Sequence, residues 1–234
     1  MPCAALTEFQ FALGWVVAAS TILLAFVPQW VKQCRRRTHI GMSLSNFLCA
    51  TFVAFLQSLN YICCEYADTF RCCGGSRSLR QCLVALQPVV QTLLGCLCYV
   101  VVVGLYFLHF DRRGLLLLGR SADRELRLAR LLALLALLAA LLVLAPLPLL
   151  AGRGLASQPV RIYGAGAGVV ATALLATHWS LQMRETWLLG GTGSLSLFGL
   201  CVGCVGNLLN AYSLAVHGGA VVGASNLVAA LMIG

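Results

Sequence analysis

Residues 131–150 read LLALLALLAALLVLAPLPLL and decide the fold class. The stretch has no hydrogen-bonding side chain, and as a helix it is about 30 Å long, which matches the hydrocarbon core of a bilayer. The whole chain is similar: 60% of its 234 residues are hydrophobic and 10% are charged. A soluble domain has about 25% charged residues. The composition therefore excludes a disordered chain, argues against a soluble enzyme and predicts an all-α membrane protein.

Residues 131–150 are the fourth of seven apolar stretches. The others are Phe9–Trp30, Ser43–Cys64, Gln81–Phe110, Tyr163–Met183, Leu195–Val216 and Ala220–Gly234. The last is too short for a full span at 1.5 Å per residue, so we expect six to seven transmembrane helices. The first is expected to be a retained span, because its apolar part is too long for a signal peptide and no basic residue precedes it.

Basic residues predict the orientation. The first, third and fifth connections between spans carry 11 Lys and Arg residues, and the opposite side carries 5. Because cytosolic connections are enriched in Lys and Arg, connections 31–42 and 111–130 should face the cytosol and connection 65–80 the lumen. The net charge of +9 therefore reflects topology and contact with the lipid bilayer, and no nucleic-acid partner is expected.

Cysteines gather around the predicted lumenal connection. They are Cys63, Cys64, Cys72, Cys73 and Cys82. An oxidising lumen permits a disulfide, and the expected pairs join Cys63 or Cys64 to Cys72 or Cys73. Free thiols and a zinc site are the alternatives. The connection has no histidine and no CxxC spacing, so no metal and no cofactor are predicted.

The chain contains an internal repeat. The first copy has PQW at 28–30, Arg35 and GMSLSNF at 41–47, and the second has THW at 177–179, Arg184 and GSLSLF at 193–198. The pattern Ser-Leu-Ser-x-Phe recurs at an offset of 151. Parallel repeats of this kind occur in transporters. The predicted organisation is a first three-helix repeat at 9–110, a basic loop and linking helix at 111–162, and a degenerate second repeat at 163–234.

These residues resemble a known family. Gly14-Trp15, Pro28-Gln29, Arg35–Arg37, Ile40-Gly41 and Ser43 look like the first repeat of PQ-loop transporters, nearest the branch of cystinosin and the lysosomal amino acid exporters. Gln87-Pro88 through Tyr106 is similar to the third helix of the cationic amino acid exporters. The resemblance covers residues 14–61 and, more weakly, 163–216. It implies the SWEET-like architecture, with two three-helix bundles joined by a linking fourth helix.

Polar side chains occur in every full span except the fourth. Because such groups need partners or a wet cavity in lipid, five spans should surround polar space while the fourth faces lipid. The candidates to line a solute path are Asn60, Gln87, Gln91, Asn207 and Asn210. The alternative for each is a hydrogen bond to a neighbouring helix. Close helix packing is the role expected of Gly164, Gly166 and Gly168.

Pro28 removes a backbone donor near the cytosolic end of the first span. The resemblance implies that Pro28 and Gln29 form a hinge for alternating access, and an ordinary end-of-helix proline is the alternative. The second repeat has Thr177 at this place, which argues against two symmetric hinges. His178 stands where the family has its second glutamine. It could relay protons, or it could be a polar residue at the membrane interface.

No catalytic constellation is present, so no enzyme activity is predicted. The predicted function is a carrier for a small polar solute, of amino acid or cystine type, in a lysosomal or vacuolar membrane. Another endomembrane and the plasma membrane are the alternative locations. A non-transporting receptor or adaptor on the same fold and a SWEET-type sugar facilitator are the alternative functions.

Overall fold

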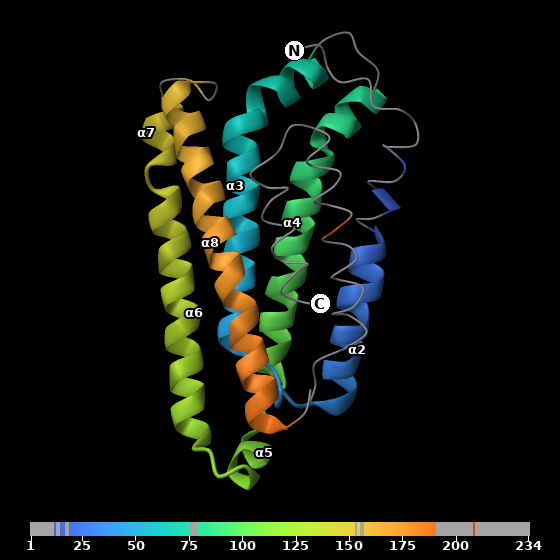
Figure 1. Ribbon diagram of the computed structural model, residues 1–234, viewed down its shortest axis with the longest axis vertical. Helices are drawn as coiled ribbons and strands as arrows, with labels where there is room; N and C mark the ends of the chain where they lie inside the picture. The colour runs from blue at the N-terminus through green and yellow to red at the C-terminus, as the bar shows by residue number, and fades with distance from the viewer. Residues whose placement is uncertain are drawn as a thin grey trace.

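The computed structural model describes residues 12, 15–16, 19–74, 79–152, 154, 157–190 and 208. Its regular elements are a π-helix, η1 (Thr21–Phe26), followed by α2 (Val27–Arg36), α3 (Leu44–Gly74), α4 (Leu79–Leu108), α5 (Arg112–Leu117), α6 (Ala122–Leu144), α7 (Leu147–Ala151) and α8 (Gln158–Leu189). The described part of the chain is therefore all-helical (Figure 1), which confirms the predicted class of secondary structure.

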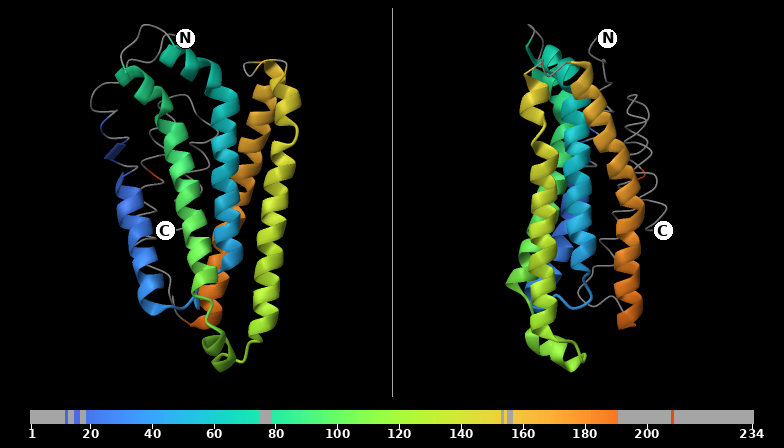
Figure 2. Two further views of the ribbon diagram at one scale, coloured as in Figure 1. Left: turned by 180° about the vertical axis from the view of Figure 1, so that it is seen from behind. Right: turned by 90° about the vertical axis from the view of Figure 1, so that its left-hand side faces the viewer.

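The long helices run along the same direction, with α4 between α2 and α3 and with α8 and α6 both packed on α3 (Figures 1 and 2). Helix α3 packs against both α4 and α8 and lies at the centre. Three segments are long and apolar enough to cross a membrane: Leu44–Cys64, Val89–Leu108 and Ala122–Leu150. The described residues thus form part of a multi-pass membrane protein by length and composition. The predicted sixth and seventh spans lie outside them, apart from Leu208.

Burial differs strongly between α3 and α6. We compare the most apolar 18-residue stretch of each span. In α3, 56% of this stretch is buried, and in the segment that begins with α6 only 6% is buried. The exposed α6 side chains are leucines, among them Leu134 at 64% and Leu142 at 65% exposure. An apolar surface of this kind is stable in lipid and unstable in water. The segment therefore has the exposed apolar surface that a lipid-facing fourth span requires, and its contact with lipid stays a prediction.

Helix α8 approaches α3 closely through two glycines. A Cβ atom added at Gly164 would lie 2.5 Å from Cβ of Cys63, and one added at Gly168 would lie 2.6 Å from Nδ2 of Asn60. The predicted packing role is confirmed at these two positions. A Cβ at Gly166 would meet nothing within 4 Å, so the prediction is wrong there.

The predicted lumenal connection is mostly helical. Helix α3 continues ten residues beyond Cys64, to Gly74, and α4 begins at Leu79. The bridge joins Cys73 to Cys82, while Cys63 and Cys64 keep free thiols. The predicted pairing of Cys63 or Cys64 with Cys73 is wrong, because a helix separates these residues by about 14 Å, whereas disulfide-bonded Cα atoms lie within about 7 Å. The side chain of Cys72 lies outside the described part.

Helix α6 corresponds to the predicted fourth span. It begins at Ala122, nine residues before the predicted start at Leu131 and within the basic connection. Ser121 precedes α6 in an extended conformation, and Asp123 and Glu125 lie in the first turn. Acidic side chains are favourable there because of the helix dipole. Helix α6 ends just before Pro146, and α7 contains Pro148 in its first turn. The prolines explain the break, since each lacks the backbone donor that would continue the ladder.

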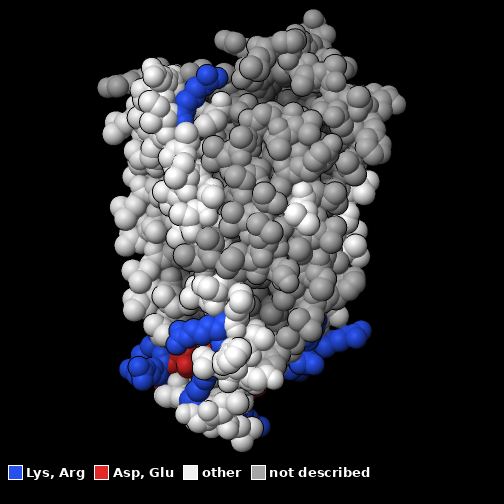
Figure 3. All heavy atoms as spheres, in the orientation of Figure 1, with Lys and Arg blue, Asp and Glu red and all other residues white. Residues whose placement is uncertain are grey.

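Basic side chains gather at one end of the molecule. Figure 3 shows most of the described Lys and Arg side chains on this face at the end that carries α5, where α2 and α8 also terminate. The basic connections therefore lie together at this end. Arg161, at the start of α8, lies at the opposite end. We call this the basic end below.

Candidate functional site

The Pro28 segment is an irregular helix. In η1 the backbone N–H of Val27 donates to the carbonyl of Ile22, five residues earlier, and α2 then begins with Pro28 in its first turn. Proline cannot donate to the carbonyl four residues before it, and its ring crowds that carbonyl. A π-turn relieves the crowding by inserting one extra residue, and such turns are frequent at functional sites. The predicted break in the hydrogen-bond ladder therefore coincides with a change of helix type.

Two buried amides follow Pro28 on one face of α2. Gln29 is 5% and Gln33 is 1% exposed. Their Nε2 atoms donate to the thioether sulfur of Met42, at 3.6 Å from Gln29 and 2.9 Å from Gln33. Oε1 of Gln33 is buried and has no hydrogen-bond partner in the described part. A thioether is a weak acceptor, so α2 is joined to the following loop by weak polar bonds.

His39 anchors that loop at the basic end. Its ring stacks on Phe110, with centroids 4.5 Å apart, and meets the edge of Tyr106 at 4.7 Å. The backbone N–H of Asp111 donates to Nδ1 of His39 at 3.0 Å, and the imidazole also bonds to the backbone of His109. A ring nitrogen that accepts a hydrogen bond carries no proton, so His39 is neutral. Burial lowers the pKa of His39, although the His109 bond and the Asp111 and Glu185 carboxylates oppose this shift.

Asp111, whose backbone N–H donates to His39, also makes a hydrogen bond through its side chain. Its carboxylate caps α5 by accepting the backbone N–H of Gly114 at 2.9 Å. This hydrogen bond, helped by one from the Thr38 side chain and by the nearby His39, holds the pKa of Asp111 below its usual range. The charged cap therefore orders the segment that donates to His39.

An ion pair joins two distant parts of the chain at the same end. Nη1 of Arg120, between α5 and α6, lies 3.0 Å from Oε1 of Glu185 near the end of α8. Both side chains are partly buried, at 31% and 21% exposure. Partial burial reduces solvent screening, so this contact is stronger than an exposed surface pair.

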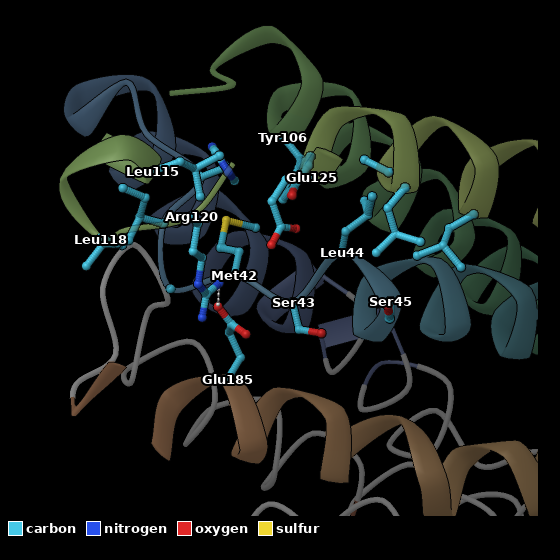
Figure 4. Close-up of a pocket in the computed structure, with 16 residues that line it drawn as sticks. Met42, Ser43, Leu44, Ser45, Tyr106, Leu115, Leu118, Arg120, Glu125 and Glu185 are labelled. Carbon is cyan, nitrogen blue, oxygen red and sulfur yellow. Dashed lines mark hydrogen bonds and ion pairs between the residues drawn. The ribbon is translucent and has the colours of Figure 1, made fainter. Parts of the chain in front are cut away.

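These elements line a partly open cavity of about 120 Å³. Its lining comes from the loop before α3, from α4, α5, the start of α6 and the end of α8: His39, Ile40, Gly41, Met42, Ser43, Leu44, Ser45, Tyr106, Leu115, Leu118, Arg120, Glu125, Leu128, Ala129, Leu132 and Glu185. Figure 4 shows Glu125 and Glu185 reaching this space from different helices, with Ser43 to one side of them and Arg120 paired to Glu185. We call it the basic-end cavity.

The solute-path candidates lie elsewhere. Nδ2 of Asn60 donates to the carbonyl of Gly164 at 2.7 Å, so Asn60 serves the α3–α8 contact. Gln87 is buried in α4, and Gln91 is partly buried one turn further on. None of the three lines the basic-end cavity. Asn207 and Asn210 lie outside the described residues, as does the side chain of His178, whose backbone is in α8.

No motif in the sequence identifies His39, Arg120, Glu125 or Glu185 as site residues. The available signal was their position, because Arg120 and Glu125 lie in the basic connection and Glu185 directly follows Arg184 of the second repeat. Comparison with models of known protein families and with curated proteins finds no match for this chain. The class therefore rests on the fold alone: the described residues are all-helical and contain three candidate membrane spans.

Proposed function

We propose that the protein is a carrier that moves a small polar organic solute, of amino acid or cystine type, across an endomembrane by alternating access. Helix α2 is the moving element and the Pro28 segment its hinge. The observation that carries the proposal is the change from π- to α-helix directly before Pro28. Helix irregularities at proline and at π-turns concentrate bending at one place. Small dihedral changes there swing the whole of α2.

The contacts of α2 suit a moving element. Its polar contacts with the loop before α3 include amide bonds to the sulfur of Met42, which is a weak acceptor. In the described part, its main helical neighbours are η1 and α4. By contrast, α3 has extensive contacts with α4 and α8. A helix with few strong contacts reorients at lower cost than one in a tightly packed core.

Buried polar groups supply the second line of support. The Gln87 amide in α4 is only 7% exposed, whereas the buried Ser58 hydroxyl in α3 donates to the carbonyl of Ala54 in its own helix. Amides and hydroxyls within a membrane helix need partners or a wet path. The resemblance of residues 14–61 to PQ-loop transporters favours the lysosomal or vacuolar membrane as the location.

The test is solute flux into liposomes that contain the purified chain. We expect uptake of labelled cystine or an amino acid, and a loss of about fivefold in Pro28→Ala, because one regained backbone hydrogen bond of about 1 kcal/mol biases a two-state equilibrium by that factor. Pro148→Ala is the matched control, since Pro148 is an exposed proline in α7. Equal flux in the wild type and Pro28→Ala would contradict the hinge.

A non-transporting receptor or adaptor is the second candidate. The observation that favours it is the contact between α3 and α8, where Asn60 and two glycines hold helices of the two repeats tightly together. Absence of flux for cystine, amino acids and sugars from well-folded protein would support the receptor over the carrier and over a sugar facilitator.

A further inference from the structure

Glu125 is a carboxylate without a cationic partner in the described part of the chain. It lies in the first turn of α6, is partly buried and lines the basic-end cavity. The guanidinium that also lines the cavity, Arg120, is paired with Glu185 at 3.0 Å. The charged lining therefore sums to one net negative charge, carried by Glu125, at an end of the molecule that is otherwise strongly basic.

We propose that the basic-end cavity binds a small organic cation, a primary ammonium on a short apolar body, with the ammonium held by Glu125. The cavity combines the two features that such a ligand needs. Glu125 and the hydroxyl of Ser45 supply acceptors, and Met42, Leu128 and Leu132 supply an apolar wall. Ligand sites typically combine an apolar lining with a few polar groups.

The charge and donor set exclude other ligand classes. An anion would meet two carboxylates and a guanidinium that already has a partner, so it is disfavoured by charge. A metal ion is disfavoured because the described residues contain no group of three or more His, Cys, Asp or Glu side chains that could hold one. An ammonium needs only one carboxylate and a few oxygen acceptors.

The cavity volume limits the size of the ligand. About 120 Å³ is available. Liquid water occupies about 30 Å³ per molecule, so the space accepts a ligand of roughly four to seven non-hydrogen atoms. Butylammonium is a suitable probe, because butan-1-ol has the same shape without the charge and butyrate reverses the charge.

Binding would also stabilise the loop before α3. Met42 and Ser43 line the cavity, and Met42 is the acceptor for Gln29 and Gln33 of α2. A ligand held by Glu125 would therefore order the loop that follows the proposed hinge. The site itself does not depend on transport, since equilibrium binding is measurable in a chain that moves no solute.

The experiment is titration of the purified full chain in nanodiscs with butylammonium, followed by thermal unfolding and by calorimetry. We expect saturable binding to the wild type and affinity at least about tenfold weaker in Glu125→Gln, because the variant loses the charge that pairs with the ammonium. Asp123→Asn is the matched control, since Asp123 lies two residues away on α6 with its side chain 78% exposed. It should bind as the wild type does. Butan-1-ol and butyrate should show no saturable binding.

A second measurement needs no variant and covers the case in which Glu125→Gln does not fold. Carbodiimide-activated amidation of the wild type, read by peptide mass spectrometry, should be slowed by butylammonium at Glu125 and not at Asp123. Three outcomes would each overturn the proposal: no saturable binding by the wild type, equal binding by Glu125→Gln, or no protection of Glu125. Solute flux could survive any of these, so the binding site and the proposed carrier function fail independently.

Discussion

At the scale of single residues, His39 combines burial, ring stacking and a backbone hydrogen bond in one side chain. It is 4% exposed and accepts the Asp111 N–H at Nδ1. Protonating Nδ1 would replace this acceptor by a donor and break the bond. The charged groups that face His39 are Asp111, Glu185 and Arg120, and the hydroxyl of Tyr106 belongs to the same cluster. The residue therefore makes docking of the loop dependent on pH.

The pH prediction follows from the lowered pKa of His39. A base whose pKa in the folded protein lies below its usual value of 6.5 binds fewer protons folded than unfolded. Its stabilising contribution is thus complete above pH 6.5 and is lost as the pH falls from there through the lowered pKa. We expect the thermal midpoint of the wild type to drop over this window more than that of His39→Asn, which keeps an acceptor but does not titrate. Parallel curves for the two proteins would refute the role of His39.

A pair of glycines in α8 gives a second prediction at this scale. Gly168→Ala should destabilise the protein, because its Cβ would fall 2.6 Å from Nδ2 of Asn60, which is bonded to Gly164. Gly166→Ala should be neutral or stabilising by about 0.5–1 kcal/mol, since alanine has the better helix propensity and nothing lies within 4 Å of the added atom. Thermal unfolding in detergent compares the two variants. Equal midpoints would show that α3 and α8 are not in close contact.

At the scale of elements, α3 is longer than the apolar pattern predicts, whereas α4 has the predicted length of 30 residues and begins two residues earlier, at Leu79. Helix α3 includes the polar and cysteine-rich residues 65–74, and the bridge between Cys73 and Cys82 connects its end to the start of α4. A disulfide that closes a short loop stabilises chiefly by limiting the unfolded state. The bridge thus belongs to the α3–α4 hairpin and holds its two helix ends together.

The disulfide prediction concerns this hairpin. Non-reducing peptide mass spectrometry should find Cys73 linked to Cys82 in the wild type and in a Cys63→Ser, Cys64→Ser double variant, because neither residue takes part in the bridge. In Cys82→Ser, Cys73 should become available to alkylation without reduction. Detection of Cys63 or Cys64 linked to Cys73 would mean that α3 ends earlier than the structure shows.

At the scale of the whole molecule, charge is distributed unequally between the two ends of the helices (Figure 3). The His39 contact, the Arg120–Glu185 pair and the cavity all lie at the basic end. If the basic end faces the cytosol, the cavity opens to cytosolic solutes and the disulfide lies in an oxidising compartment. The orientation of the helices therefore decides on which side of the membrane the cavity lies and on which side the disulfide lies.

Thiol labelling tests this orientation. Cys34 is exposed near the end of α2, at the basic end. A membrane-impermeant maleimide applied from the cytosolic side should label Cys34. After reduction, Cys73 and Cys82 should react only from the opposite side. Cys34→Ser controls for reaction at other thiols. Labelling of Cys34 from the lumenal side alone would reverse the topology and place the cavity in the lumen.

The sequence by itself determined what depends on local composition and chain geometry. The leucine run 131–150 predicts an exposed apolar helix, and Pro28 predicts a break in the hydrogen-bond ladder. The glycine row predicts close packing at three positions, and the structure confirms it at Gly164 and Gly168 but not at Gly166. Each follows from the chemistry of neighbouring residues along one helix. Only the tertiary structure decided the rest, because it depends on contacts between residues distant in sequence. Arg120 meets Glu185, and His39 meets Asp111, across the fold. Cys73 pairs with Cys82 because α3 continues through residues 65–74, and that extension is absent from the apolar pattern.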